Sequence, residues 1–230
     1  MKKTFLYINF ALMALLLVFD LIYMFVGGLA LKTITSCVFV AMGVVNLIFA
    51  IKEGKPFKFL IILASALFVA MLGDVIINIH FMAGAIIFAI GHVIYFVSYM
   101  QLNKFELSNL VYIVAIAVPS MLIVLFAPGL DYGGSVMKIV CCIYALIISF
   151  MVGKSLANFL KEKTITNLFI LIGSCLFFVS DLMLLLDVFG SIPATGYLCL
   201  ATYYPGQALI AFGGYMYVIS NKKQNEGGEK

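Results

Sequence analysis

Two aspartates, Asp74 and Asp181, stand inside apolar stretches that are long enough to cross a lipid bilayer. An ionisable side chain in hydrocarbon is energetically costly, so such a residue usually has a function. Two carboxyl groups in one apolar site can divide the roles of proton donor and base, as they do in glycosidases. The pair therefore predicts a buried acid–base site, which requires a fold that brings the two side chains together.

The residues that surround the two aspartates form a repeat. The first copy contains Asp74, Phe81, Gly91-His92 and Tyr99, and the second contains Asp181, Phe189, Gly206-Gln207 and Tyr215. The spacing from Asp to Phe is 7 residues in the first copy and 8 in the second, and the spacing from His or Gln to Tyr is also 7 and then 8. The repeat predicts one polar site built from two related halves.

The composition predicts an all-α, polytopic membrane protein. Hydrophobic residues make up 65% of the chain and charged residues only 10%, and the mean hydropathy of +1.19 is far above that of soluble domains. About 20 apolar residues cross the bilayer core, and eight such stretches are present, at residues 4–26, 31–51, 58–78, 81–101, 109–127, 134–153, 165–187 and 196–219. We therefore expect a bundle of eight transmembrane helices, forming a single integral membrane domain over residues 1–230, with a polar, disordered tail at 221–230.

The lysines predict the orientation of the helices. All 14 basic residues are lysines. If the N-terminus is cytoplasmic, 12 of them lie on that side, and only Lys32 and Lys138 lie on the other. This asymmetry predicts that the N- and C-termini are both cytoplasmic. The net charge of +4 reflects the topology, and no basic stripe with interleaved aromatics points to nucleic acid.

The same orientation predicts the depth of the two aspartates. The helices expected at 58–78 and 165–187 are four spans apart and share one direction, so the internal repeat, which also includes the helix after each, is expected to be parallel. Both helices run outward, and each aspartate is the 17th residue of its helix. The site is therefore expected in the extracytoplasmic half of the membrane. Abundant Lys without Arg suggests an AT-rich bacterial genome, and hence the bacterial cytoplasmic membrane.

Helical spacing adds further candidate residues. His92 is a candidate catalytic residue because it lies midway along its predicted helix, near the depth of the aspartates. The candidates for substrate binding share a helix face with an Asp, a His or a Gln, and they are Asn78, Tyr95, Tyr204 and Gln207. Three residues keep two interpretations each. Asp20 is either part of the site or a structural hydrogen-bond acceptor, His80 is functional or a solvated loop residue, and Asp187 belongs to the site or to the surface.

The cysteines are not expected to bind metal. All five, Cys37, Cys141, Cys142, Cys175 and Cys199, fall within apolar stretches, and none forms a C-x-x-C pair. With two histidines in the chain, no zinc-ligand spacing is found. We expect the thiols to be small, buried packing residues.

The segments GDVIINIHF, GHVIYFVSY, SDLMLLLDVF and YYPGQALIAFGGY resemble the YhhN family, the lysoplasmalogenases. The resemblance covers about residues 67–215. It implies an eight-helix membrane hydrolase that cleaves the vinyl ether of lysoplasmalogens to a fatty aldehyde and glycerophosphoethanolamine or glycerophosphocholine. The residues that it carries over are Asp74, His92, Asp181, Tyr204 and Gln207.

The paired aspartates suit this reaction. Protonation of the alkene carbon creates an oxocarbenium ion, which water captures, so one carboxyl group would give the proton and the other would stabilise the cation. We expect His92 and Gln207 to position the water or a substrate oxygen and Tyr204 to donate a hydrogen bond. Which aspartate is the acid stays open. The reaction needs no cofactor, and the expected partners are a lysophospholipid substrate and the bilayer, with the oligomeric state open.

A small proton-coupled transporter is the main alternative. Paired intramembrane acids in a parallel repeat are also found in carriers, where protonation is coupled to movement of a substrate. Against a carrier, the polar residues gather in one half of the membrane and do not line a path to both sides. A serine hydrolase is not supported, because the chain lacks a G-x-S-x-G motif.

Overall fold

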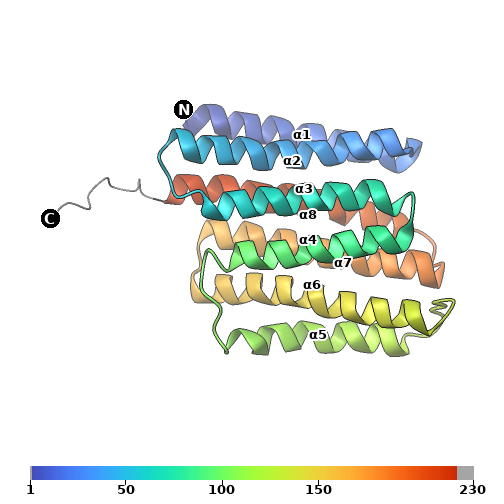
Figure 1. Cartoon of the computed structure of the whole chain (residues 1–230). Helices are drawn as coiled ribbons and strands as arrows, with labels where there is room; N and C mark the ends of the chain where they lie inside the picture. Colours follow the sequence, from blue (N-terminus) through green and yellow to red (C-terminus); the bar gives the residue numbers. More distant parts are fainter. Residues whose placement is uncertain (1, 222–230) are drawn as a thin grey trace.

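The computed structural model describes residues 2–221, and within this range the chain forms eight α-helices and no strand. The helices are α1 (Lys2–Val26), α2 (Leu29–Lys52), α3 (Lys58–Ile77), α4 (Phe81–Tyr99), α5 (Asn109–Phe126), α6 (Ser135–Lys161), α7 (Ile165–Gly190) and α8 (Thr195–Ser220). They run side by side in one bundle, and α8 ends at the end of the bundle where α1 begins (Figure 1). The predicted all-helical membrane bundle is confirmed. Residues 222–230, which make up nearly all of the predicted tail, lie outside the described residues.

Seven of the eight described helices, α1 to α7, are long and apolar enough to cross a membrane. The eighth, α8, has 26 residues but contains many Tyr, Gly and Thr residues. Its position explains this composition, because α8 packs against α1, α2, α3 and α7 and has 13 buried residues. A helix that other helices surround faces protein on most sides, so it needs less hydrocarbon-compatible surface than a peripheral one.

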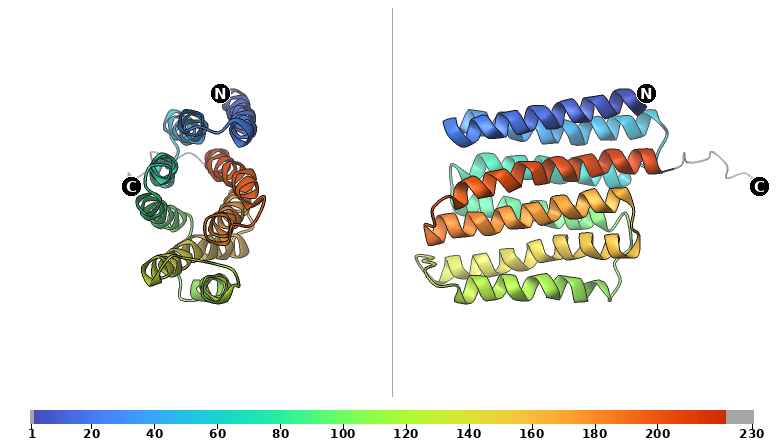
Figure 2. Two further views of the ribbon diagram at one scale, coloured as in Figure 1. Left: turned by 90° about the vertical axis from the view of Figure 1, so that its right-hand side faces the viewer. Right: turned by 180° about the vertical axis from the view of Figure 1, so that it is seen from behind.

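Six helices form a closed ring in the order α2, α3, α4, α6, α7 and α8. Each packs against the next, and α8 packs against α2 to complete the circle (Figure 2). Helix α1 lies outside the ring against α2 and α8, and α5 lies outside it against α6. The ring thus contains α2–α3–α4 followed by α6–α7–α8, so helices four apart in the chain occupy corresponding places in its two halves. The outer helices are less alike, because α1 packs against α2 and α8, whereas α5 packs against α6 alone among the described helices.

Glycines allow the closest helix pair, α7 and α8, to approach. A Cβ atom added at Gly173 would lie 2.7 Å from the carbonyl oxygen of Gly206, and one added at Gly213 would lie 2.8 Å from the side chain of Ile170. Such distances are shorter than any ordinary contact, so these positions tolerate only glycine without a shift of the helices. Small residues at helix contacts are the usual way in which membrane helices pack closely.

The prediction that the cysteines are buried is wrong. Cys37 and Cys175 are exposed on the bundle surface, and Cys141, Cys142 and Cys199 are partly exposed. The physical reason is that the surface of a membrane helix faces lipid, where a thiol is as well accommodated as in a protein interior. Apolar surroundings in the sequence therefore do not distinguish a core position from a lipid-facing one.

Candidate active site

Asp74 lies near the end of α3, where hydrogen-bond donors from two other helices meet its carboxyl group. The hydroxyl of Ser36 on α2 donates to Oδ2 at 2.6 Å, and the hydroxyl of Tyr203 on α8 donates to the same oxygen at 2.8 Å. The Nζ atom of Lys32, one turn before Ser36, lies 3.9 Å from Oδ1. Two hydroxyl donors and a nearby ammonium group stabilise the ionised form of a carboxyl group.

Asp181 on α7 has a different pair of partners. The hydroxyl of Tyr144 on α6 donates to Oδ2 at 2.7 Å, and Nε2 of His92 on α4 lies 3.0 Å from the same oxygen. Nε2 of His92 is also 2.8 Å from the Tyr144 hydroxyl, so the three polar groups form a compact triangle. A carboxyl group and an imidazole within hydrogen-bond distance of each other can pass a proton between them, so the geometry suits acid–base chemistry.

The two clusters occupy corresponding places in the two halves of the ring. Asp74 on α3 is bonded by the preceding helix α2 and by α8, and Asp181 on α7 is bonded by the preceding helix α6 and by α4. In the order of helices around the ring, α2 corresponds to α6 and α4 to α8, so the helices that supply the partners correspond as well. The side chains do not, since Asp74 has hydroxyl partners and Asp181 has a hydroxyl and an imidazole. The repeat thus supplies two carboxyl groups in different environments.

Both carboxyl groups line one cavity of about 470 Å³ near the loop end of α3 and α7. Its polar or charged lining residues include Lys32, Asp74, Asn78, Asp181, Asp187, Tyr197 and Tyr203. The side chain of Asp181 is 13% exposed, against 3% for Asp74, so Asp181 is the more accessible of the two. Three carboxyl groups face a single ammonium group across this space. The arrangement therefore suits a ligand or intermediate that carries positive charge.

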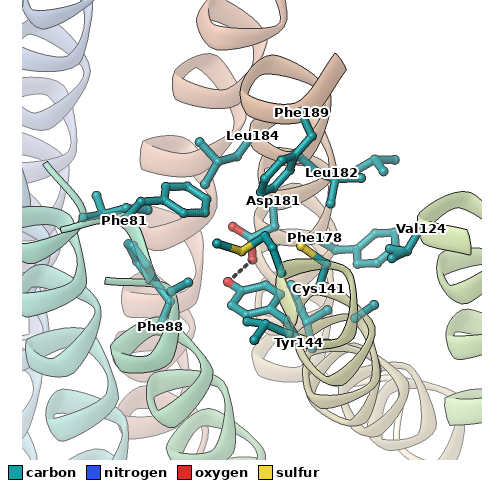
Figure 3. A pocket seen from close by; sticks show the side chains of 17 residues that line it. Phe81, Phe88, Val124, Cys141, Tyr144, Phe178, Asp181, Leu182, Leu184 and Phe189 are labelled. Carbon is teal, nitrogen blue, oxygen red and sulfur yellow. Dashed lines mark hydrogen bonds between the residues drawn. The ribbon is translucent and has the colours of Figure 1, made fainter. Parts of the chain in front are cut away.

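A narrower, apolar groove of about 90 Å³ continues from the cavity along Asp181 (Figure 3). Asp181, Ile77, Phe81, Phe88 and Leu184 line both spaces. The remaining walls are almost wholly hydrocarbon and come from α4, α5, α6 and α7. The union of a charged cavity and an apolar groove fits an amphiphile whose polar part and chain meet at Asp181.

The loop between α5 and α6 is fixed at the mouth of this groove. The Tyr132 ring lies 5.0 Å from the ring of Phe189, and the Tyr132 hydroxyl donates to the carbonyl oxygen of Val124 at 2.8 Å. The backbone N–H of Asp131 donates to the carbonyl oxygen of Phe189 at 2.8 Å. Burial of the phenol raises the pKa of Tyr132 to about 12. The loop is thus tied to the end of the helix that carries Asp181.

The half of the ring away from the cavity is closed by side chains that reach across it. The hydroxyl of Tyr95 on α4 donates to Oε1 of Gln207 on α8 at 2.6 Å, and the hydroxyl of Tyr99 lies 2.9 Å from Oγ of Ser174 on α7. Asn158 on α6 donates to the carbonyl oxygen of Tyr99 at 2.9 Å. All these side chains are buried. Below the aspartates, the ring is therefore filled and cross-linked, and the structure gives the cavity a floor.

The structure divides six of the seven predicted site residues into three pairs. Asp74 and Asn78 lie together, because Asn78 donates to the Asp74 carbonyl oxygen and lines the cavity. His92 lies with Asp181. Tyr95 and Gln207 pair with each other in the floor, and Nε2 of Gln207 is buried without a hydrogen-bond partner among the described residues.

Tyr204 lies behind the cavity wall. It is fully buried, and its hydroxyl lies 3.4 Å from Oγ of Ser36 and 3.4 Å from the carbonyl oxygen of Lys32. These distances are at the limit of a hydrogen bond. The neighbouring Tyr203 makes the short bond to Asp74, so the adjacent residue of the same helix faces the carboxyl group.

The three residues with two interpretations lie in different places. Asp20 is buried in α1, and its Oδ1 has no hydrogen-bond partner within residues 2–221. His80 is exposed and is the N-cap residue of α4, where its ring nitrogen accepts a hydrogen bond from the backbone N–H of Ala83 at 3.2 Å. Asp187 is exposed, yet it lines the cavity.

Sequence reasoning missed Ser36, Tyr144 and Lys32, and it preferred Tyr204 to Tyr203. Tyr203 shares the polar stripe of α8 with Gln207, so the signal was present but did not distinguish two adjacent tyrosines. Ser36 and Tyr144 lie on α2 and α6, in which the repeat cannot be recognised. Lys32 was considered only as one of the lysines whose distribution predicts the orientation of the helices.

The fold and these contacts define a polytopic membrane protein with one buried polar site, built from equivalent helices of two halves. Within the described residues, no three His, Cys, Asp or Glu side chains are grouped as metal ligands would be. The model of the YhhN family matches residues 28–214, which cover every residue of the two carboxyl clusters, and the chain belongs to that family. No curated protein and no solved structure matches the chain.

Proposed function

We propose that this protein hydrolyses the vinyl ether bond of lysoplasmalogens, releasing a fatty aldehyde and a glycerophospho-alcohol such as glycerophosphoethanolamine. Membership of the YhhN family supports a protein of the lysoplasmalogenase type. The observation that carries the proposal is that two carboxyl groups face one cavity, which continues as an apolar groove. A single-chain amphiphile would lie with its chain in the groove and its ether oxygen beside Asp181.

The different partners of the two aspartates suggest their roles. Ser36, Tyr203 and the nearby Lys32 would favour the carboxylate form of Asp74, which would then stabilise a cation and orient water. Asp181 lies within hydrogen-bond distance of His92 and is the more accessible carboxyl group, so it would be the proton donor. Its contacts with Tyr144 and His92 both use Oδ2, which leaves Oδ1 for the substrate.

The reaction balances without a cofactor. A proton from the Asp181–His92 pair would bond to the alkene carbon that is not attached to oxygen, using both π electrons for the new C–H bond. A lone pair of the ether oxygen would then stabilise the adjacent cationic carbon as an oxocarbenium ion. Water would add to this cation while its proton passes to a carboxylate, which restores the protonation state of the site. The resulting hemiacetal would break its bond to the glycerol oxygen, leaving the aldehyde and a free hydroxyl group.

The head group would lie at the loop end of α3 and α7, where Asn78 and Asp187 line the cavity. The lysine asymmetry supports an outward orientation of this end, so the head group would be in the outer interface of the bacterial cytoplasmic membrane. The lipid would reach the site from the bilayer, because the groove is lined by hydrocarbon side chains.

A proton-coupled carrier is less well supported. Alternating access needs a path from the site to both sides of the membrane. The Tyr95–Gln207 and Tyr99–Ser174 bonds cross the ring on the inner side of the aspartates, and a carrier would have to break both in each cycle. A hydrolase needs an opening on one side only.

The test is aldehyde release from purified, detergent-solubilised protein incubated with an alkenyl lysophosphatidylethanolamine. The Asp74→Asn and Asp181→Asn variants keep the size of each side chain and remove its acid–base function. We expect aldehyde from the wild type and a loss of at least about 10³-fold in each folded variant, the scale of general acid–base catalysis. Acyl lysophosphatidylethanolamine, which has no vinyl ether, is the matched control and should give no aldehyde. Proton-driven uptake into proteoliposomes without any aldehyde would instead identify a carrier.

A further inference from the structure

Lys32 and Asp187 carry opposite charges and line the same cavity, and the proposed reaction gives Asp187 no catalytic role. Lys32 comes from α2 and Asp187 from the outer end of α7, and both line the cavity. Asp74 and Asp181 lie deeper along α3 and α7 and carry the proposed chemistry. Asp187 is six residues after Asp181, which corresponds to about 9 Å along the helix axis toward the mouth.

The ammonium group of Lys32 lies beside Asp74 but is too far from it for a hydrogen bond. Its Nζ is 3.9 Å from Asp74 Oδ1, which is an ionic contact but is longer than a hydrogen bond. Its side chain is only 13% exposed, so little water replaces the missing bonds. An ammonium group in a nearly enclosed cavity has donors for an anionic oxygen of a ligand.

Asp187 is the corresponding anion near the mouth. Its Oδ1 lies 3.3 Å from the hydroxyl of Thr195, but the single proton of that hydroxyl has a nearer acceptor in the Ile192 carbonyl oxygen at 2.7 Å, and Asp187 is exposed. Tyr197, also a lining residue, is 55% exposed and lies two positions after Thr195. A carboxylate with an accessible aromatic ring nearby is the combination that binds alkylammonium groups.

We propose that Lys32 and Asp187 select a zwitterionic head group, with its phosphate on Lys32 and its ammonium group at Asp187. This inference rests on the proposed hydrolysis and assigns residues to the substrate's polar end. It predicts discrimination by charge. Lipids with the same chain and a different head group are poorer substrates, because a purely anionic head group leaves Asp187 without its partner and an uncharged one leaves both Lys32 and Asp187 without theirs.

The experiment compares three alkenyl lipids with one chain: a phosphoethanolamine, a phosphoglycerol and an alkenylglycerol without phosphate. The ratio of kcat/KM for phosphoethanolamine over phosphoglycerol reports the ammonium group. In Asp187→Asn this ratio falls about tenfold, which corresponds to 1.4 kcal/mol. The ratio for phosphoglycerol over alkenylglycerol reports the phosphate, and it falls by a similar factor in Lys32→Gln. Ratios are used because Lys32 also lies beside Asp74, and an effect on the chemical step cancels between substrates.

Two charge-matched variants at the same end of the bundle serve as controls. Asp131→Asn and Lys138→Gln remove the same charges from residues that do not line the cavity, and they leave both ratios unchanged. If aldehyde is released but neither ratio moves in the cavity variants, or the controls move them equally, the head-group assignment is overturned. If the wild type releases no aldehyde from any of the three lipids, it is the proposed function that fails.

Discussion

The Tyr203→Phe substitution tests whether the proposed role of Asp74 depends on the hydrogen bonds that its carboxyl group accepts. The substitution removes one hydroxyl, which donates to Asp74 Oδ2 at 2.8 Å, and keeps the ring. That ring lies 5.1 Å from Phe177 and 6.0 Å from Phe88, so the aromatic packing beneath the cavity is preserved. The expected effect is therefore on the carboxylate and not on the fold.

The magnitude follows from the kind of bond that is lost. A hydrogen bond to a charged group contributes roughly 1.5–3 kcal/mol. If Asp74 must be ionised and oriented when the oxocarbenium ion forms, this loss raises the barrier by a similar amount. Since about 1.4 kcal/mol changes a rate tenfold, kcat should fall roughly 10- to 150-fold. Ser36 still donates to the carboxylate, so the activity should not be abolished.

The neighbouring Tyr204 offers a matched control. Tyr204→Phe removes a hydroxyl whose contacts are both 3.4 Å long and do not include Asp74, so we expect less than about a threefold change. Single-turnover aldehyde release, measured with thermal unfolding of each variant in detergent, separates catalysis from stability. A full-rate Tyr203→Phe protein, or an equal loss in Tyr204→Phe, would refute the assignment of Asp74 as the supported carboxylate.

Three further outcomes are expected. Ala145→Phe fills the groove beside Asp181, so kcat/KM should fall more for long-chain than for short-chain alkenyl lipids, and an equal loss for both would argue against the groove as the chain site. Gly173→Ala brings a Cβ to 2.7 Å from the Gly206 carbonyl and should cost about 1–3 kcal/mol of stability, whereas Gly91→Ala, where the nearest atom is 3.7 Å away, should unfold close to the wild-type temperature. Burial raises the pKa of Tyr132 to about 12, above that of an unfolded tyrosine, so its contribution to stability is complete below about pH 10 and is lost as the pH rises through 12. Thermal unfolding of Tyr132→Phe should therefore differ from the wild type at neutral pH and converge with it in strong alkali, and a constant difference would show that the phenol proton is not involved.

The sequence predicted the helices well. Every described helix overlaps a predicted stretch, because burial in lipid requires an unbroken apolar helix and leaves a local signal. It also predicted that both aspartates belong to one site, and the structure brings both to one cavity. Gln207 and Tyr95 were expected to bind substrate, but in the structure they bond to each other across the ring. A polar residue at mid-membrane can serve equally well to link two helices.

The partners that sequence reasoning missed were invisible for a physical reason. A serine in a membrane helix can bond its own helix, and the Lys32 carbonyl oxygen, 2.9 Å from the Ser36 hydroxyl, is an alternative acceptor for the single proton that Ser36 donates to Asp74 at 2.6 Å. Its type therefore carries no information about a second partner. Tyr144 lies 37 residues from Asp181, and Tyr203 lies 129 residues from Asp74. Nothing in the local pattern of either tyrosine marks these contacts.

The sequence alone determined that this is a membrane protein of eight helices with a doubled acidic residue near one end of two equivalent helices. These properties are local, because hydropathy, helix length and residue spacing belong to each segment by itself. Only the tertiary structure decided the order of helices around the ring, and with it the partners that make Asp74 and Asp181 chemically different. That order depends on close contacts between side chains of distant segments, which no single segment encodes.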